Sequence, residues 1–153
     1  MKTIKQFLAV LLIGGLSLVS LSASAASFSN SVTGVSGYDL VAYHTVGQAT
    51  KGNGHNVSVH DGVTYLFANA DNKKAFDANP EKYLPAYGGW CAFGVSVGKK
   101  FVSDPEAWKI VDGRLYLNLD ENIQADWLKD VPGRIKAANG HWTKIQNKSP
   151  AEL

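Results

Sequence analysis

Two Asp-Gly dipeptides, Asp61-Gly62 and Asp112-Gly113, constrain the fold of this chain more than any other feature of its sequence. Each one separates two short segments that suit strands. Asp-Gly favours a two-residue type I′ turn, because both central residues of that turn need a positive φ. We therefore expect two β-hairpins, whose strands cover 55–60, 63–68, 108–111 and 114–118.

The second hairpin can be assigned a register. A two-residue turn pairs Val111 with Arg114 and, further along, Trp108 with Leu117. Side chains alternate across a strand, so each face of the hairpin can be read from this register. One face is apolar and is expected to be core; it carries Trp108, Ile110, Leu115 and Leu117. The other face carries Lys109, Val111, Arg114 and Tyr116.

Caps and breakers predict the segments around the hairpins. The apolar and aromatic segment 38–44 is expected to be extended. Asn69 or Asp71 can cap a short helix that runs to about Ala78, before a proline. The segment 90–97 suits a short helix and, nearly as well, a strand.

The C-terminal part is expected to be helical, because its apolar residues recur at helical spacing. Asp130 and Pro132 divide this stripe into two helices. The stripe consists of Ile123, Trp127, Val131, Ile135, Ala138, Trp142 and Ile145. Together with the hairpins it predicts a small single domain of the α+β class, in which we see no internal repeat.

Residues 1–25 have the features of a signal peptide. Lys2 and Lys5 precede an apolar stretch of about 15 residues, shorter than the ~20 of a membrane-spanning helix. Ala23-Ser24-Ala25 fits a cleavage site, so we expect a mature chain that starts at Ala26, has no membrane anchor and is periplasmic or secreted. It divides into a flexible lead-in, a domain and a tail at 26–36, 37–147 and 148–153.

Charge and missing motifs exclude several classes of function. Without Lys2 and Lys5, the basic residues equal the 13 acidic residues, and no run of Lys or Arg exceeds two. Nucleic acid and anionic membranes are therefore not expected as partners. The sequence motifs of dinucleotide, phosphate-loop, dithiol, zinc-protease and serine-hydrolase sites are also missing. This argues against a self-sufficient enzyme but leaves activity open.

Cys91 is the single cysteine of the chain, so it cannot form an intramolecular disulfide. If a helix begins at Trp90, the thiol lies in its first turn, where backbone N–H groups and the helix dipole favour a thiolate. A thiolate can bind a soft metal ion or attack a disulfide. A cysteine among aromatics can equally be a small buried hydrophobe. The nearby aromatics, which suggest either core or a pocket, are Tyr83, Tyr87, Trp90 and Phe93.

Two further side chains are candidate metal ligands. His44 is the most suggestive of the four histidines, because it lies in an apolar segment after Asp39. Asp39 itself could be a metal carboxylate or a general base. A hydrogen-bonded structural His44, and an Asp39 that closes an Asx-turn or caps a neighbouring element, explain the same pattern. The sequence leaves both alternatives open.

Six sequence blocks in a fixed order resemble a known family. They are 37–43, 62–68, 80–85, 88–92, 104–108 and 112–118. In order and spacing they resemble the exported bacterial YHS domain-containing proteins. YHS domains are presumed metal-binding modules, found in some copper-transporting ATPases and as stand-alone proteins. Their usual hairpin cysteine is replaced by Ala68 here, whereas the exported branch keeps the cysteine at position 91.

Three hypotheses follow for the function. The first, which the resemblance favours, is a binding module for a soft or borderline metal ion such as copper or zinc; Cys91 is its anchor, and Asp39 and a histidine, His44 first, are the candidate partners in an open site. Alternatively, Cys91 is the nucleophile of a thiol-redox protein that needs a partner thiol. The third hypothesis is a non-catalytic structural or interaction domain with an unknown periplasmic protein partner. A fully buried cysteine among aromatics would favour the third.

Overall fold

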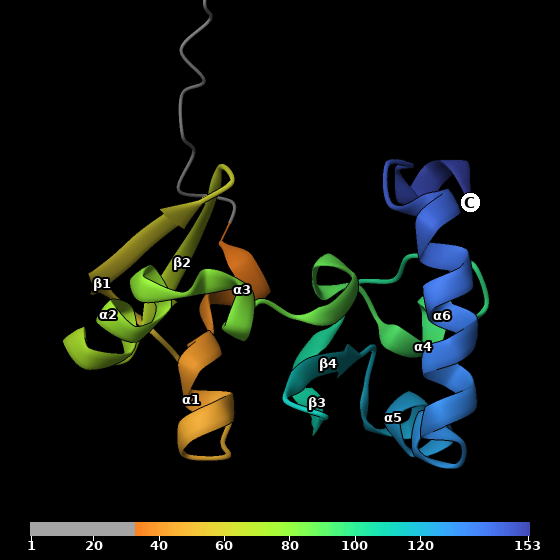
Figure 1. Ribbon diagram of the computed structural model, residues 1–153, viewed down its shortest axis with the longest axis horizontal. Helices are drawn as coiled ribbons and strands as arrows, with labels where there is room; N and C mark the ends of the chain where they lie inside the picture. Colours follow the sequence, from red (N-terminus) through yellow and green to blue (C-terminus); the bar gives the residue numbers. More distant parts are fainter. Residues whose placement is uncertain (1–32) are drawn as a thin grey trace, which may run out of the picture.

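The computed structural model describes residues 33–153; the predicted signal peptide lies outside these residues. Figure 1 shows a molecule with one hairpin and several short helices at one end, the other hairpin in the middle, and the longest helix, α6, at the other end. The elements are, in chain order, η1 (Gly34–Gly37), α1 (Leu40–Thr45), β1 (Asn53–His60), β2 (Val63–Phe67), α2 (Ala70–Ala78), α3 (Pro80–Tyr83), η2 (Ala86–Gly89), α4 (Ala92–Ser96), β3 (Asp104–Val111), β4 (Arg114–Asn118), α5 (Glu121–Leu128), α6 (Val131–Ile145) and η3 (Pro150–Glu152), where η marks a 3-10 helix.

The predicted hairpins and the α+β class are confirmed. β1 pairs with β2, and β3 with β4, in two separate antiparallel sheets of two strands. Both turns have positive φ at their two central residues, as a type I′ turn requires: 48° and 76° at Asp61 and Gly62, and 49° and 75° at Asp112 and Gly113. The predicted register from Val111 through Trp108 is also confirmed.

The helix predictions are largely confirmed. The Asn69 side chain caps α2 by accepting the N–H of Asn72 at 2.8 Å, and Asp130 caps α6 in the same way through Gly133 at 3.0 Å. The segment after Cys91 is a helix, α4, and not a strand. The apolar stripe faces inward, since Trp127 and Ala138 are fully buried.

The extended segment predicted for 38–44 is wrong. The chain forms the helix α1 there, and the Asp39 side chain caps it by accepting the N–H groups of Val41 and Ala42. The four residues Leu40–Tyr43 are all buried. A short helix that is buried on every side shows no helical periodicity, so the apolar run suggested a strand.

Both ends of the predicted domain extend further than expected. Thr33 forms an isolated β-bridge with Thr64, and a Cβ on Gly34 would lie 2.2 Å from the Tyr65 ring. These residues of the predicted lead-in are therefore part of the fold. The predicted tail also packs, because Leu153 contacts the core and the Lys148 carbonyl accepts a hydrogen bond.

An internal repeat, which we did not expect from the sequence, organises the fold. The first unit, residues 34–83, contains η1, α1, β1, β2, α2 and α3. The second unit, residues 86–145, contains η2, α4, β3, β4, α5 and α6 in the same order. In both units the hairpin strands have eight and five residues. Six elements of matching type in matching order indicate one structural unit that occurs twice.

The backbone details repeat as well. Each unit opens with three consecutive residues at positive φ and has a further glycine at positive φ after its first short helix. These residues are Val35, Ser36, Gly37 and Gly47 in the first unit, and Tyr87, Gly88, Gly89 and Gly98 in the second. Both hairpins also have the same register shift in the long strand. In the first hairpin the shift lies between the pairs Asn53–Phe67 and Val57–Leu66. In the second it lies between Asp104–Asn118 and Trp108–Leu117.

Two clusters of buried residues form the core, with the hairpin β3–β4 between them (Figure 1). Leu115 and Leu117 belong to the cluster of the first unit, as the predicted apolar face requires. Tyr116, on the opposite face, belongs to the cluster of the second unit, with Val111 packed beside it. Each face of this hairpin therefore contributes side chains to one of the two core clusters, and the hairpin joins the two units.

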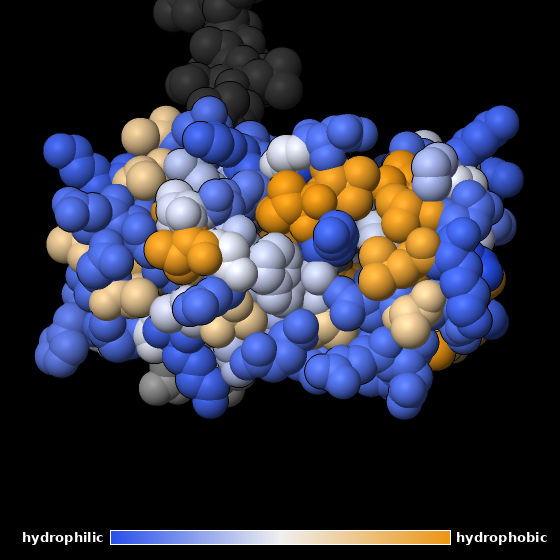
Figure 2. All heavy atoms as spheres, turned by 90° about the horizontal axis from the view of Figure 1, so that it is seen from below, coloured by the Kyte–Doolittle hydropathy of each residue, from blue (hydrophilic) through white to orange (hydrophobic). Residues whose placement is uncertain are grey.

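Apolar side chains gather on one face of the molecule. Figure 2 shows hydrophobic residues gathered on the face seen from below, over the part that carries β3, β4 and α5. None of the helices formed by residues 33–153 has the length and hydropathy to cross a bilayer.

Candidate functional site

Asp39 is a structural cap. Its carboxylate is fully buried, and Oδ1 accepts the N–H groups of Val41 at 2.9 Å and Ala42 at 3.2 Å. Oδ2 accepts the N–H of Ala68 at 2.9 Å and the side-chain amide of Asn72 at 2.7 Å. Both oxygens are thus used in joining α1 to the end of β2 and the start of α2. This is the capping alternative of the sequence analysis.

Cys91 is fully buried at the start of α4. Its Sγ accepts the N–H of Gly94 at 3.4 Å and lies 4.0 Å from Oδ1 of Asn118. Burial raises the pKa of the thiol, while the backbone N–H groups of Gly94, Leu119 and Phe93 act in the opposite direction. The thiol therefore stays protonated more readily than a free cysteine and has no exposed surface for attack.

The repeat explains why a polar atom is needed here: Cys91 occupies the position that Asp39 has in the first unit. The backbone N–H of Asp39 donates to Thr50, and that of Cys91 donates to Phe101 at the corresponding place. The Gly94 N–H corresponds in turn to the Ala42 N–H that Asp39 accepts. Cys91 is accordingly the N-cap of α4, with sulfur in place of a carboxylate.

His44 lies on α1, away from the cysteine. Its ring meets the Tyr83 ring edge-on with centroids 5.4 Å apart, and its Nε2 is buried without a hydrogen-bond partner. Burial, and to a lesser degree the charge of Lys82, lowers the pKa of His44. The side chain is a half-buried packing residue of the first unit.

The three predicted metal ligands do not form a site. Within residues 33–153 no group of three His, Cys, Asp or Glu side chains is placed to hold a metal ion. The Asp39 carboxylate already accepts four hydrogen bonds, and Cys91 is fully buried in the other unit. The residues present do not fit the copper or zinc site that the resemblance implies.

The four aromatics near Cys91 do not line one pocket. Tyr83 belongs to the core cluster of the first unit. Tyr87 is buried in the second unit, where its hydroxyl donates to Asn139 at 3.0 Å and burial raises its pKa to about 12. Trp90 and Phe93 line two different hollows. The predicted pocket beside the thiol is therefore replaced by two separate surface features.

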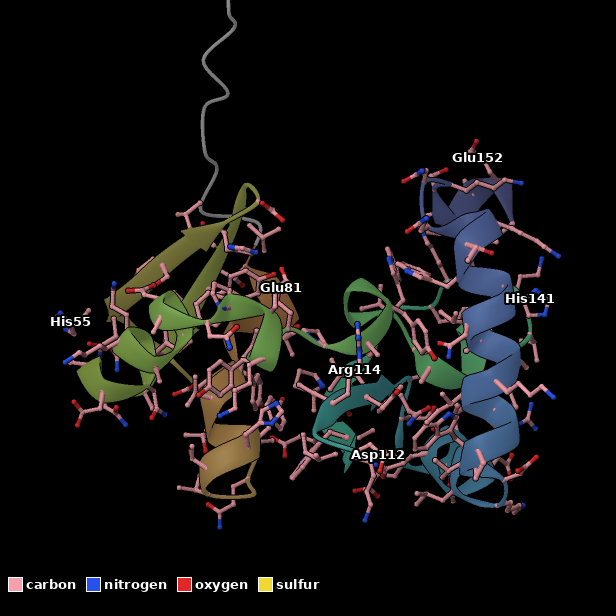
Figure 3. All side chains as sticks on the ribbon, viewed as in Figure 1. His55, Glu81, Asp112, Arg114, His141 and Glu152 are labelled. Carbon is pink, nitrogen blue, oxygen red and sulfur yellow. The ribbon has the colours of Figure 1, made fainter. Side chains whose placement is uncertain are left out.

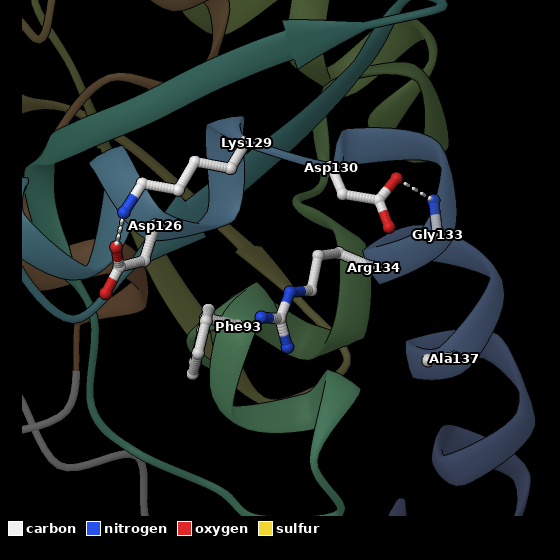
Figure 4. A pocket seen from close by; sticks show the side chains of 7 residues that line it. All are labelled: Phe93, Asp126, Lys129, Asp130, Gly133, Arg134 and Ala137. Atoms are coloured by element: carbon white, nitrogen blue, oxygen red, sulfur yellow. Dashed lines mark hydrogen bonds and ion pairs between the residues drawn. The ribbon is translucent and has the colours of Figure 1, made fainter.

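The hollow at Phe93 lies between α5 and α6 and measures about 500 Å³ (Figure 4). The Arg134 guanidinium stacks 4.2 Å from the centre of the Phe93 ring. Asp126 pairs with Lys129 across its edge, and Asp130 is engaged in capping α6. Its charged groups are of both signs and most already have partners within the protein.

A larger groove, about 860 Å³ in volume, lies where the two units meet. The first unit contributes His60, Asp61, Tyr65 and Glu81, and the second contributes Trp90, Val102, Arg114 and Trp142. Figure 3 shows Glu81 on the side of the first unit and Arg114 on the side of the second. Sites between domains or structural units commonly bind ligands, so this groove is the best candidate for a binding surface.

Lys100 holds the aromatic wall of the groove in place. Its Nζ lies 5.6 Å from the centre of the Trp90 ring and 5.3 Å from that of Trp142. The same atom donates to the carbonyl oxygens of Gln146 at 2.9 Å and Lys148 at 2.6 Å, just beyond the end of α6. Lys100 is only 8% exposed. A buried ammonium group that contacts both indole rings favours one arrangement of the two rings, so less ordering is needed when a ligand binds.

Sequence reasoning missed Lys100, Arg114 and the groove. Trp142 was predicted only as part of an apolar stripe. The available signal was weak: a tryptophan near the end of a helical stripe, and a lysine after Gly98. Neither shows that the two side chains meet.

The chain matches no protein-family model, no curated protein and no solved structure. The resemblance to the exported YHS domain-containing proteins stays a prediction.

Proposed function

We propose that residues 33–153 form a non-catalytic binding module, and that the groove between the two units is its recognition surface. The observation that carries this proposal is the braced pair of Trp90 and Trp142, which lines a groove of about 860 Å³. Rigid aromatic side chains supply binding area with little loss of conformational entropy. This is the hypothesis of a non-catalytic interaction domain from the sequence analysis, and it now includes the position of the binding surface.

The position of Cys91 supports this choice over metal binding and thiol chemistry. The thiol is fully buried, has a raised pKa and serves as a helix cap. It is not part of the groove lining. A redox role would require an accessible sulfur, and a metal site would require further ligands, but no group of three His, Cys, Asp or Glu side chains within residues 33–153 is placed to hold a metal ion.

The four tryptophans provide the test. Trp90 and Trp142 line the groove, whereas Trp127 is fully buried and Trp108 packs against the core of the first unit. We would record the indole N–H resonances of the ¹⁵N-labelled protein while adding short peptides, oligosaccharides or nucleotides. A ligand of the groove shifts the resonances of Trp90 and Trp142 and leaves those of Trp108 and Trp127 in place.

The control is a pair of charge deletions on the second hairpin. Arg114 lines the groove and Lys109 does not, although both are exposed. Arg114→Ala should weaken the binding of an active ligand, and Lys109→Ala should leave it unchanged. If no class of compound shifts the Trp90 and Trp142 resonances, the groove is not a recognition surface and the proposal fails.

A further inference from the structure

We infer that the occupant of the groove is an extended polypeptide segment that carries proline, with a basic residue toward the first unit and an acidic residue toward the second. This inference rests on the proposed function, since it names the ligand class of the same groove.

The distribution of exposure across the groove is the first argument. Its indole rings are partly buried, and Tyr65 is 8% exposed. Its charged groups, Asp61, Glu81 and Arg114, are exposed at the edge. An apolar centre with a polar rim is the usual anatomy of a surface that binds polypeptide. Trp, Tyr and Arg are also the residue types that contribute most binding energy at such surfaces.

The braced indoles are the second argument. Lys100 contacts both Trp90 and Trp142, which gives the groove a preorganised aromatic surface beside polar side chains such as Ser36, His60 and Ser103. Proline-rich segments suit aromatic-lined grooves, because their polyproline II conformation exists before binding and the rings present flat apolar faces. Pro85 and Leu84 extend the apolar lining along the segment that links the two units.

Charge complementarity sets where the charged residues of the segment lie in the groove. On the first unit, Asp61 and Glu81 lie 3.6 Å and 3.5 Å from Nε2 of His60, and both carboxylates are largely exposed. On the second unit, Arg114 is the exposed cation of the groove and has no ion-pair partner among the described residues. A basic side chain of the ligand would face Asp61 and Glu81, and an acidic one would face Arg114.

The experiment uses two fluorescent capped peptides, Lys-(Pro)₄-Glu and Glu-(Pro)₄-Lys, because the groove fixes the charges but not the chain direction. Binding is followed by fluorescence anisotropy with the purified protein. At least one peptide should bind, and replacing its four prolines by glycine should weaken binding at least ~10-fold. Equal binding of the glycine peptide would overturn the polyproline part of the inference.

Three variants locate the peptide. Trp142→Ala should weaken binding at least ~10-fold. Val102→Asp, at a groove residue that is 71% exposed and so can change without unfolding the protein, should also weaken it. Arg114→Glu should weaken binding of the bound peptide by ~2- to 5-fold, because the Glu of the peptide then faces a like charge. Replacing that Glu of the peptide by Lys should restore binding to the variant. Unchanged binding in Val102→Asp would place the peptide elsewhere and overturn the inference.

The remaining outcomes separate this inference from the proposed function. If a maltooligosaccharide shifts the Trp90 and Trp142 indole resonances and neither peptide does, the ligand class is wrong but the groove remains a recognition surface. If sedimentation shows a dimer that Val102→Asp abolishes, the occupant is a second copy of the chain, and the inference is overturned. If neither peptide nor any other probe acts on these indoles, both proposals fall.

Discussion

The first and second units begin their short helices with different side chains at the same place. The Asp39 carboxylate accepts two N–H groups of α1 and two further donors, from Ala68 and Asn72, whereas the Cys91 thiol accepts the Gly94 N–H of α4. The shared requirement is an acceptor for the free N–H groups at the start of the helix. Considered alone, a buried Cys or Asp suggests a metal site. The comparison of the two units shows instead that the two residues occupy the same position at the start of a helix. Each is therefore a cap.

The units differ most where they form the groove. The first ends in the four-residue helix α3, whereas the second continues into α6, which carries Trp142. Lys100 occupies the place that Ala49 has in the first unit, and Ala49 merely packs against the core. The repeated features therefore stabilise the fold, and the features that break the repeat build the candidate binding surface.

Removing the two caps should give the largest difference between the units. Asp39→Ala removes the carboxylate that accepts three backbone N–H groups and the Asn72 amide, and of these donors only the Ala42 N–H keeps a second acceptor, the Asp39 carbonyl oxygen at 3.2 Å. We expect a loss of about 3 kcal/mol or more in the free energy of unfolding, since each unsatisfied buried donor costs ~1–3 kcal/mol. Urea denaturation followed by circular dichroism measures it. A loss below ~1 kcal/mol would show that Asp39 is not a structural cap.

A second difference between the units lies just before the long strand of each hairpin, where the first unit has Gly52 and the second has Ser103 at the equivalent position. A Cβ on Gly52 would lie 2.3 Å from the backbone carbon of Leu66, so Gly52→Ala should cost about 1–3 kcal/mol through overpacking. Ser103→Ala removes only the hydrogen bond from its hydroxyl to the Gly89 carbonyl, about 1 kcal/mol. Thermal denaturation of both variants compares them. If the two variants lost the same free energy of unfolding, the close contact of Gly52 with Leu66 would not distinguish the first unit from the second.

Cys91→Ala should have a smaller effect than Asp39→Ala. The substitution removes one acceptor, for the Gly94 N–H, and a small amount of buried volume. We expect a loss of about 1–2 kcal/mol in the free energy of unfolding. Ligand binding in the groove should persist, because Cys91 does not line it. A folded Cys91→Ala protein that no longer binds the groove ligand would contradict this assignment.

The smallest expected effect is a pH dependence specific to the first unit. Burial holds the pKa of His44 below its ordinary value of about 6.5, so the unfolded chain binds the proton more readily. The contribution of neutral His44 to the free energy of unfolding is therefore complete above about pH 6.5 and decreases as the pH falls below that value. His44→Phe should reduce the fall in stability between about pH 8 and about pH 5. An unchanged pH profile would exclude this role for His44.

Much of the fold was predictable because its signals are local. The Asp-Gly turns fixed both hairpins and the register of Val111 with Arg114, and caps such as Asn69 marked helix starts. The repeat was not predictable, because what recurs is backbone conformation and capping. The clearest shared residues are Asp-Gly and, after two residues that differ, Tyr-Leu, at 61–66 and 112–117.

The candidate site was the harder part to predict. Sequence reasoning weighed single residues by chemical type, which drew attention to Cys91, Asp39 and His44. Whether such groups converge depends on contacts between distant segments, as does the meeting of Lys100 with Trp142. The contact of one lysine with two tryptophans does not depend on a fixed spacing in the sequence, so no sequence motif predicts it.

The reactivity of Cys91 in the native protein tests the central claim most directly. The thiol is titrated with an Ellman-type reagent in the folded and the urea-unfolded protein, with and without Cu(I) or Zn(II), and native mass spectrometry checks for bound metal. If Cys91 is a buried helix cap, it reacts only after unfolding, and neither ion binds to the folded protein. Reaction in the folded state would contradict this account, and protection by a metal ion would restore the metal-binding hypothesis.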